Sequence, residues 1–169
     1  MAKVPGGDDY DATQEQQFGN AANVMGTNDS SKLNVFTSRT LGMAEGRHLK
    51  ASDKYTSMIH EDLAKANGLK VGDTLTLKAN AYDADNESHS TATVKTTIVG
   101  IFKGDSARKV SSRAELTANT IYTDLDTTRD LYQYKDGKEI YQDATFVLSK
   151  GVDVEKTMDL SLIHISEPT

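Results

Sequence analysis

Two stretches in the middle of the chain alternate polar and apolar residues with the period of a β-strand. Residues 74–79 place Leu75 and Leu77 on one side and threonine or lysine on the other, and residues 91–102 begin with the same alternation. Because successive side chains of a strand point to opposite faces, each stretch predicts a strand with one buried face. The polar residues 83–89 between them favour an antiparallel hairpin.

The second of these stretches becomes apolar on both faces toward its end. Ile98, Ile101 and Phe102 lie there together with Gly100. Since a strand that is apolar on both sides is typical of a covered sheet, we expect its last residues to be buried in a sheet or small barrel. A glycine inside a strand indicates a bulge or a close approach of another backbone segment.

A short helix is expected just before the first strand of the hairpin. Ile59, Leu63 and Ala66 recur at helical spacing, and the Asn-Gly pair at 67–68 supplies the left-handed residue on which many helices end. Residues 70–73 then predict a turn that leads into the strand.

Similar patterns predict the remaining elements. Asp124 is expected to begin a helix, because its carboxylate can accept hydrogen bonds from the free amides of the first turn. That helix carries Leu125, Thr128 and Leu131 on one side. Short apolar or alternating stretches predict strands at 21–25, 33–37, 120–123 and 142–148, and a last helix is expected near Val152.

Charge and composition exclude several classes of function. With 25 acidic and 19 basic residues the formal net charge is -6, and Lys and Arg form no cluster, so we expect no nucleic-acid binding. The absence of Cys from the 169 residues excludes disulfides, thiolate metal sites and cysteine nucleophiles. No apolar run is long enough to cross a bilayer, and the amino end has no apolar stretch typical of a signal peptide.

Histidines are the first candidates for acid–base catalysis, and His48 and His60 have no catalytic partner beside them in the sequence. We interpret His48, which follows Gly46 and Arg47, as a hydrogen-bonded or solvated residue, and His60 as the start of the expected helix. Neither a Gly-x-Ser-x-Gly elbow nor a phosphate-binding glycine loop is present. Turn and cap roles explain four carboxylates that could otherwise pair for catalysis: Asp53, Glu61, Asp62 and Asp73.

A metal site at the polar tip of the hairpin is the remaining possibility for site chemistry. His89 lies there beside Asp83, Asp85 and Glu87. A calcium loop of the EF-hand type needs Gly at its sixth position and Glu at its twelfth, whereas counting from Asp83 these positions hold Ser88 and Val94. We interpret the tip as a solvated loop. The sequence therefore predicts no catalytic, cofactor-binding or metal-binding residue, and no enzyme activity.

The order and spacing of several segments resemble the MacB-like core domain of FtsX-type ABC permeases from Gram-positive bacteria. These segments are GRHLK at 46–50 with Asp53, residues 58–76, TIVGIFKG at 97–104, NTIYTDLDTTRDL at 119–131 and YQDATFV at 141–147. The patterns above and the resemblance together predict an α+β fold. It would combine a β-rich subdomain, built on an antiparallel hairpin or small barrel-like sheet with short helices, with part of an α/β-sandwich subdomain.

The resemblance implies a function that depends on parts outside this chain. In the family the domain lies on the extracytoplasmic face of the cell membrane and works with a cytoplasmic ABC ATPase, reached through transmembrane helices. The implied role is to transmit ATP-driven motion, to contact an exported peptide, lipoprotein or toxin, or to do both. A second permease copy is a further implied partner, and no cofactor is implied.

The resemblance also divides the chain. Residues 1–32 match weakly and are expected to be a partial lead-in to the extracytoplasmic domain, which then spans 33–159 as a truncated unit. The last ten residues, LSLIHISEPT at 160–169, interrupt an amphipathic helix pattern. They resemble translated sequencing-adapter read-through, so we expect a non-native tail that includes His164 and Pro168.

Two other interpretations stay open. Residues 64–77 (AKANGLKVGDTLTL) also resemble the barrel module of molybdopterin oxidoreductases, in which a helix, a glycine, a Gly-Asp turn and a strand recur. The acidic composition without catalytic groups is also compatible with a surface domain for adhesion or peptide binding.

Overall fold

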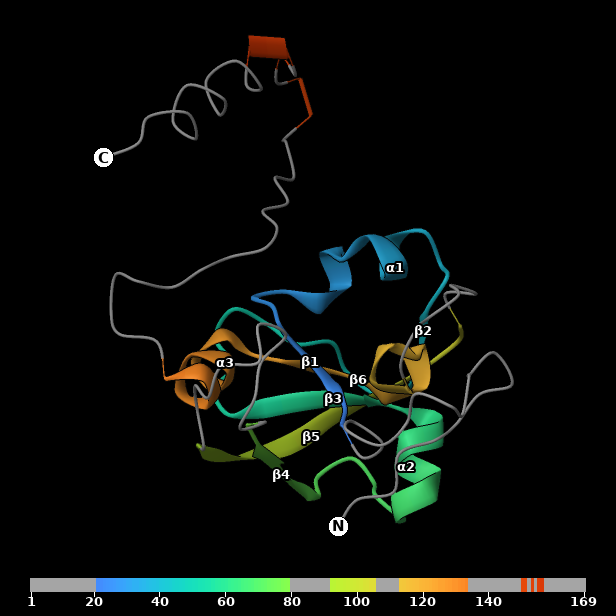
Figure 1. Ribbon diagram of the computed structural model, residues 1–169. Coiled ribbons are helices and arrows are strands. Elements are labelled where there is room, and N and C mark those ends of the chain that lie inside the picture. The colour runs from blue at the N-terminus through green and yellow to red at the C-terminus, as the bar shows by residue number, and fades with distance from the viewer. Residues whose placement is uncertain are drawn as a thin grey trace.

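A six-stranded sheet organises the part of the chain that the computed structural model describes, namely residues 21–79, 92–105 and 113–133 and five residues between 150 and 156. Its strands are β1 (Asn23–Gly26), β2 (Gly42–Gly46), β3 (Thr56–His60), β4 (Thr74–Lys78), β5 (Thr93–Lys103) and β6 (Thr120–Thr123). The helices are α1 (Asn34–Thr37), α2 (Glu61–Asn67) and α3 (Leu125–Tyr132), with short 3-10 turns η2 (Ser30–Lys32), η3 (Arg113–Glu115) and η4 (Thr117–Asn119). Figure 1 shows these elements, with the mixed sheet between the helices. The α+β class expected from the sequence is confirmed.

The sheet mixes parallel and antiparallel pairs in the order β1-β6-β3-β5-β2. Strand β5 runs parallel to β3, while β2 and β4 both pair with β5 in the antiparallel direction. Strand β6 is antiparallel to β3 and parallel to β1. The long strand β5 therefore holds the sheet together, because its first half pairs with β4 and its second half with β2 and β3.

The predicted hairpin is confirmed, and so is the predicted special role of Gly100. Residues in β5 alternate between exposed and buried up to Ile98, after which Gly100, Ile101 and Phe102 are all buried. The register with β3 shifts at this point, so Val99 is bulged. A Cβ atom on Gly100 would lie 2.3 Å from the backbone oxygen of Arg47. Only glycine allows this approach, because no real Cβ contact is that short.

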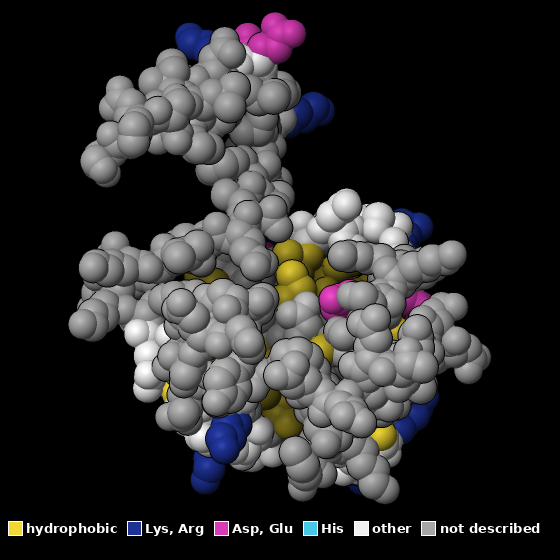
Figure 2. Space-filling model, in the orientation of Figure 1, with side chains coloured by type: hydrophobic (Ala, Val, Ile, Leu, Met, Phe, Trp, Pro, Cys, Tyr) yellow, Lys and Arg dark blue, Asp and Glu magenta, His cyan; other side chains and the backbone are white. Residues whose placement is uncertain are grey.

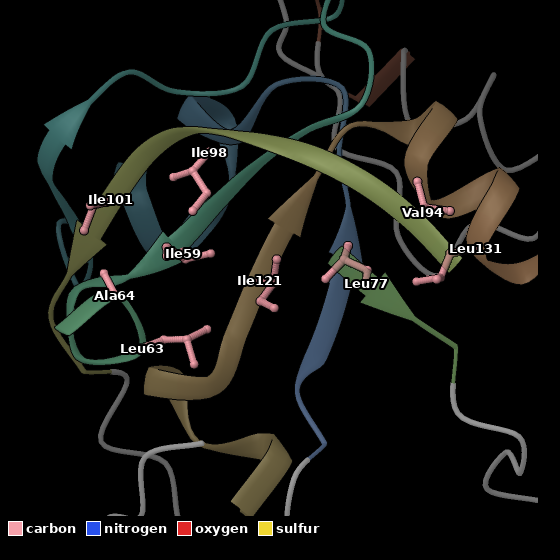
Figure 3. Close-up of a cluster of buried hydrophobic side chains, with 9 residues drawn as sticks. All are labelled: Ile59, Leu63, Ala64, Leu77, Val94, Ile98, Ile101, Ile121 and Leu131. Carbon is pink, nitrogen blue, oxygen red and sulfur yellow. The ribbon is translucent and has the colours of Figure 1, made fainter. Parts of the chain in front are cut away.

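Both faces of the sheet carry a hydrophobic cluster, because neighbouring residues of the central strands point to opposite sides. One cluster lies under α2 and α3 (Figure 3) and consists of Ile59, Leu63, Ala64, Leu77, Val94, Ile98, Ile101, Ile121 and Leu131. The other lies under α1 and consists of Phe36, Leu41, Leu49, Met58, Phe102 and Tyr122. Phe36 meets the rings of Phe102 and Tyr122 edge-on, with centroids 5.9 and 5.7 Å apart.

Two sequence expectations were wrong. The strand expected at 33–37 is the helix α1, whose first turn is closed by amides of Phe36 and Thr37 bonded to the Leu33 carbonyl. The packing of Phe36 against the second cluster overrides the local strand pattern. Ile59 belongs to strand β3 rather than to the following helix, which begins at Glu61.

Other local expectations are confirmed. Helix α2 ends at Gly68, which has φ 64°, and the turn and strand that follow are where the sequence placed them. Asp124 caps α3, with its carboxylate accepting from the amide of Thr127. The hairpin tip at 83–89, the strand expected at 142–148, Val152 and the tail at 160–169 lie outside the described residues. Among the helices of the described part, none is long and apolar enough to cross a membrane.

Candidate functional site

The GRHL segment forms a loop that is closed by an ion pair. Arg47 donates from Nη1 to Oδ2 of Asp53 at 2.6 Å and from Nη2 to Oδ1 at 2.9 Å. Asp53 Oδ2 also accepts from the amide of Lys50 at 3.0 Å, so one carboxylate closes both ends of the turn. The Arg47 guanidinium holds the pKa of the Asp53 carboxyl below its usual range, and the same bond raises the pKa of Arg47.

The middle of this loop is anchored in the core by Leu49 and His48. Leu49 is fully buried, and its amide donates to Oγ of Ser30 at 3.0 Å. The Ser30 hydroxyl also lies 3.1 Å from the sulfur of Met58 and 3.0 Å from Nδ1 of His48. The His48 ring meets Phe36 edge-on, with centroids 5.0 Å apart.

Counting protons at Ser30 favours the Nδ1–H tautomer of His48. A serine hydroxyl has one proton and two lone pairs. One lone pair accepts from Leu49, so the contacts to Met58 and His48 are both satisfied when the hydroxyl donates to Met58 and His48 donates from Nδ1. Burial lowers the pKa of His48, and the nearby carboxylate of Asp29 opposes this effect. Of the two alternatives that the sequence left open for His48, hydrogen-bonded or solvated, the structure shows the hydrogen-bonded one, with Ser30 as a partner that the sequence did not reveal.

His60 is also held by the protein backbone. Its Nδ1 accepts from the amide of Asp62 at 3.1 Å, which caps α2, and its Nε2 lies 3.0 Å from the carbonyl oxygen of Gly104. With Nδ1 accepting, Nε2 carries the proton and donates. His60 is 4% exposed, so both ring nitrogens make their hydrogen bonds away from solvent. This arrangement suits a structural histidine and confirms its expected place at the helix start.

Three consecutive residues after the GRHL loop each contact a different aspartate of the α3 segment. Lys54 Nζ lies 3.1 Å from Oδ2 of Asp126, and the Tyr55 hydroxyl donates to Oδ2 of Asp130 at 2.8 Å. The Thr56 amide donates to Oδ2 of Asp124 at 2.6 Å. The bond to Asp130 raises the pKa of Tyr55, and Lys54 lowers the pKa of Asp126. These contacts join the start of β3 to α3 across about 70 residues of sequence.

The backbone of Tyr55 lies in the left-handed region, with φ 52°. Such a conformation is uncommon for a bulky residue and costs on the order of 1 kcal/mol. It is held from two sides, because the Tyr55 carbonyl accepts from the amide of Thr97 in β5 at 2.9 Å while the hydroxyl bonds to α3. Tyr55 as a whole is 44% exposed.

A cleft of about 200 Å³ lies between this loop and the start of α3. The residues that line it are Thr27, Asn28, Lys50, Ala51, Ser52, Asp53, Lys54, Asp124, Leu125, Asp126 and Arg129. The charges of the cleft are balanced, since three cationic and three anionic residues line it. The carboxylates of Asp53, Asp124 and Asp126 already bond to protein groups, so the cleft carries no net preference for one sign of charge.

The described residues contain no cluster suited to a metal ion. No group of three or more His, Cys, Asp or Glu side chains in this part of the chain could bind a metal ion. The hairpin tip with His89, which the sequence predicts to be a solvated loop and not a metal site, lies outside the described residues. In Figure 2 the Lys and Arg side chains of the described residues stand at separate places around the face in view. What the geometry offers is a closed loop bonded to a helix, with a cleft of about 200 Å³ between them.

Comparison with known proteins assigns no family to this arrangement. No protein-family model matches the chain, and a search of curated proteins finds no match. Function therefore has to be argued from the site itself and from the residues that carry the resemblance.

Proposed function

We propose that this chain is the extracytoplasmic part of an ABC transporter permease subunit, which transmits ATP-driven motion, contacts an exported peptide, lipoprotein or toxin, or does both. The observation that carries the proposal is spatial. Segments 58–76, 97–104 and 119–131, which are far apart in sequence, contain most of β3, most of β5 and all of β6, and these strands are neighbours in one sheet. The GRHL segment joins the same unit, because the Arg47 amide donates to the Val99 carbonyl of β5 at 3.0 Å.

The chemistry of the site supports a mechanical or binding role rather than catalysis. His48 and His60 each bond to protein groups, and the carboxylates of the cleft are engaged in ion pairs or helix capping. A catalytic centre needs a nucleophile and base that can reach a substrate. A domain that transmits motion instead needs elements that are joined by several contacts. The three contacts between residues 54–56 and the α3 segment provide such a connection.

A surface domain that binds peptides without transport is the second candidate, and the cleft favours it. A cavity of about 200 Å³ with both signs of charge could hold one polar side chain of a peptide. The two candidates differ in whether an ATPase is a partner.

The test is co-purification from membranes. The complete gene is expressed with its chromosomal neighbours, the permease is tagged, and the membrane extract is captured on the tag. The proposal expects an ABC ATPase subunit in the captured complex, and no ATPase when a version without the flanking segments is tagged instead. Recovery of the full-length protein without any ATPase would support the surface-domain candidate. Molybdenum or tungsten in the purified protein would favour the oxidoreductase module.

A further inference from the structure

Residues 50–55 form a strap between two fixed points. On one side Leu49 is fully buried in the second hydrophobic cluster. On the other side β3 begins at Thr56, in the middle of the sheet. Between these points the exposed turn is closed by Asp53, whose amide donates to the Lys50 carbonyl at 2.9 Å. The strap can therefore change its direction mainly where it leaves this closed turn, at Lys54 and Tyr55.

Tyr55 is the strained point of the strap. Its φ of 52° lies in the left-handed region, which glycine adopts readily and which is sterically unfavourable for tyrosine. Such conformations persist only when the surrounding structure over-determines them, and they are concentrated at switch regions and clamps. The contacts that hold Tyr55 come from separate elements: the Thr97 amide of β5 bonds to its carbonyl, and Asp130 of α3 bonds to its hydroxyl.

The α3 side of this arrangement consists of contacts that can be broken singly. The Lys54–Asp126 pair is solvent-exposed on the lysine side, where the side chain is 73% accessible. The Tyr55–Asp130 bond is also exposed. By contrast, Asp124 is buried and is bonded to Thr56 and Thr127, so it keeps β3 and the start of α3 together. The side chains of Asp126 and Asp130 could thus rotate away and release Lys54 and Tyr55, while Leu131 of α3 stays in the first hydrophobic cluster.

We propose that Tyr55 is a strained hinge and that α3 is the latch that holds it. When Asp126 and Asp130 withdraw, Tyr55 relaxes toward the ordinary β or right-handed region, its carbonyl turns away from Thr97, and the strap swings off the cleft that it borders. The hinge is a property of the domain, whereas its use in passing motion from α3 to the cleft rests on the proposed function.

The test is native-state hydrogen exchange on the 169-residue chain, followed at the Thr97 amide. Tyr55→Ala and Tyr55→Gly both remove the ring and hydroxyl, but only glycine adopts φ near 52° without strain. The proposal expects Tyr55→Ala to exchange at Thr97 about fivefold faster than Tyr55→Gly, the ratio that about 1 kcal/mol of strain produces. Rates are taken relative to the slowest amides of β5, so that a change in global stability does not enter.

The latch is tested by the double variant Asp126→Ala with Asp130→Ala. We expect faster exchange at Thr97, although Thr97 contacts neither aspartate in the bonds described above. The control is Asp62→Ala, which removes an exposed carboxylate from the first turn of α2 and should leave Thr97 unchanged. Equal exchange in Tyr55→Ala and Tyr55→Gly would overturn the hinge, and unchanged exchange in the double variant would overturn the latch. Neither result depends on whether an ATPase binds the complete protein.

Discussion

Arg47 and Asp53 form a bidentate ion pair across six residues, and the same carboxylate holds the amide of Lys50. Because the two charges are bonded at two points and the pair also closes a turn, it should contribute more than an ordinary surface ion pair. We expect Asp53→Asn to lower the free energy of unfolding by about 1 kcal/mol, measured by urea denaturation. The matched control is Glu61→Gln, which removes the single-point Lys65–Glu61 pair on α2. This variant should lower the free energy of unfolding by only a few tenths of the loss expected for Asp53→Asn. Equal losses in the two variants would contradict the role assigned to Asp53.

The same carboxylate should make stability depend on pH in the acid range. The pKa of Asp53 in the folded protein lies below its ordinary value of 3.8. The unfolded chain therefore binds the proton first, so the stabilisation is complete above pH 3.8 and is lost as pH falls through the folded pKa. Urea midpoints measured from pH 7 to pH 2.5 should fall less steeply below pH 4 in Asp53→Asn than in the parent chain. Midpoints that fall equally steeply with pH in both proteins would show that the Arg47–Asp53 pair does not stabilise the folded state.

His48 gives a second pH dependence, with its own window. Burial lowers its pKa below 6.5, so between the folded pKa and 6.5 the unfolded chain binds more protons, and stability falls as pH decreases through that window. NMR correlation of the ring nitrogens with ring protons should show the neutral Nδ1–H tautomer and a midpoint below 6.5. A neutral Nε2–H tautomer, or a midpoint above 6.5, would contradict the hydrogen-bond network assigned to Ser30.

Two glycines of neighbouring strands provide a test of the β5 bulge. A Cβ on Gly100 would lie 2.3 Å from the Arg47 oxygen, whereas a Cβ on Gly42 would meet nothing within 4 Å. We expect Gly100→Ala to destabilise the protein by about 2 kcal/mol or more, since backbone must move to make room. Gly42→Ala should change stability by less than about 0.5 kcal/mol, as measured by thermal unfolding. Similar melting temperatures for the two variants would mean that the close approach at Gly100 is absent in solution.

The sequence was informative wherever a local pattern decides the structure. Gly68 ends α2, Asp124 caps α3, and the alternation of β4 and β5 gives their buried face, because each feature depends on residues within one or two turns. Strand β3 was missed because its residues Met58 and Ile59 are buried on opposite faces and show no alternation. A short apolar run of that kind fits a strand or a buried helix equally well.

The candidate site could not be predicted from the sequence for a different reason. GRHL and Asp53 were recognisable as a motif, but the bonds from Tyr55 to Asp130 and from Thr56 to Asp124 span 75 and 68 residues. Such pairs follow from the sheet topology, in which β3 and β6 are neighbours, and not from any local spacing. The strain at Tyr55 is likewise set by these distant partners, since nothing in the residue itself favours a left-handed backbone.

The complete reading frame of the gene tests the central claim most directly. If the chain belongs to a permease, sequencing beyond both ends should reveal an apolar helix of about 20 residues upstream of Met1 and several such helices downstream of residue 159. The adapter interpretation of residues 160–169 predicts in addition that an independently cloned gene continues with a different sequence after residue 159. A complete frame that encodes no transmembrane helix on either side would contradict the transport function proposed here.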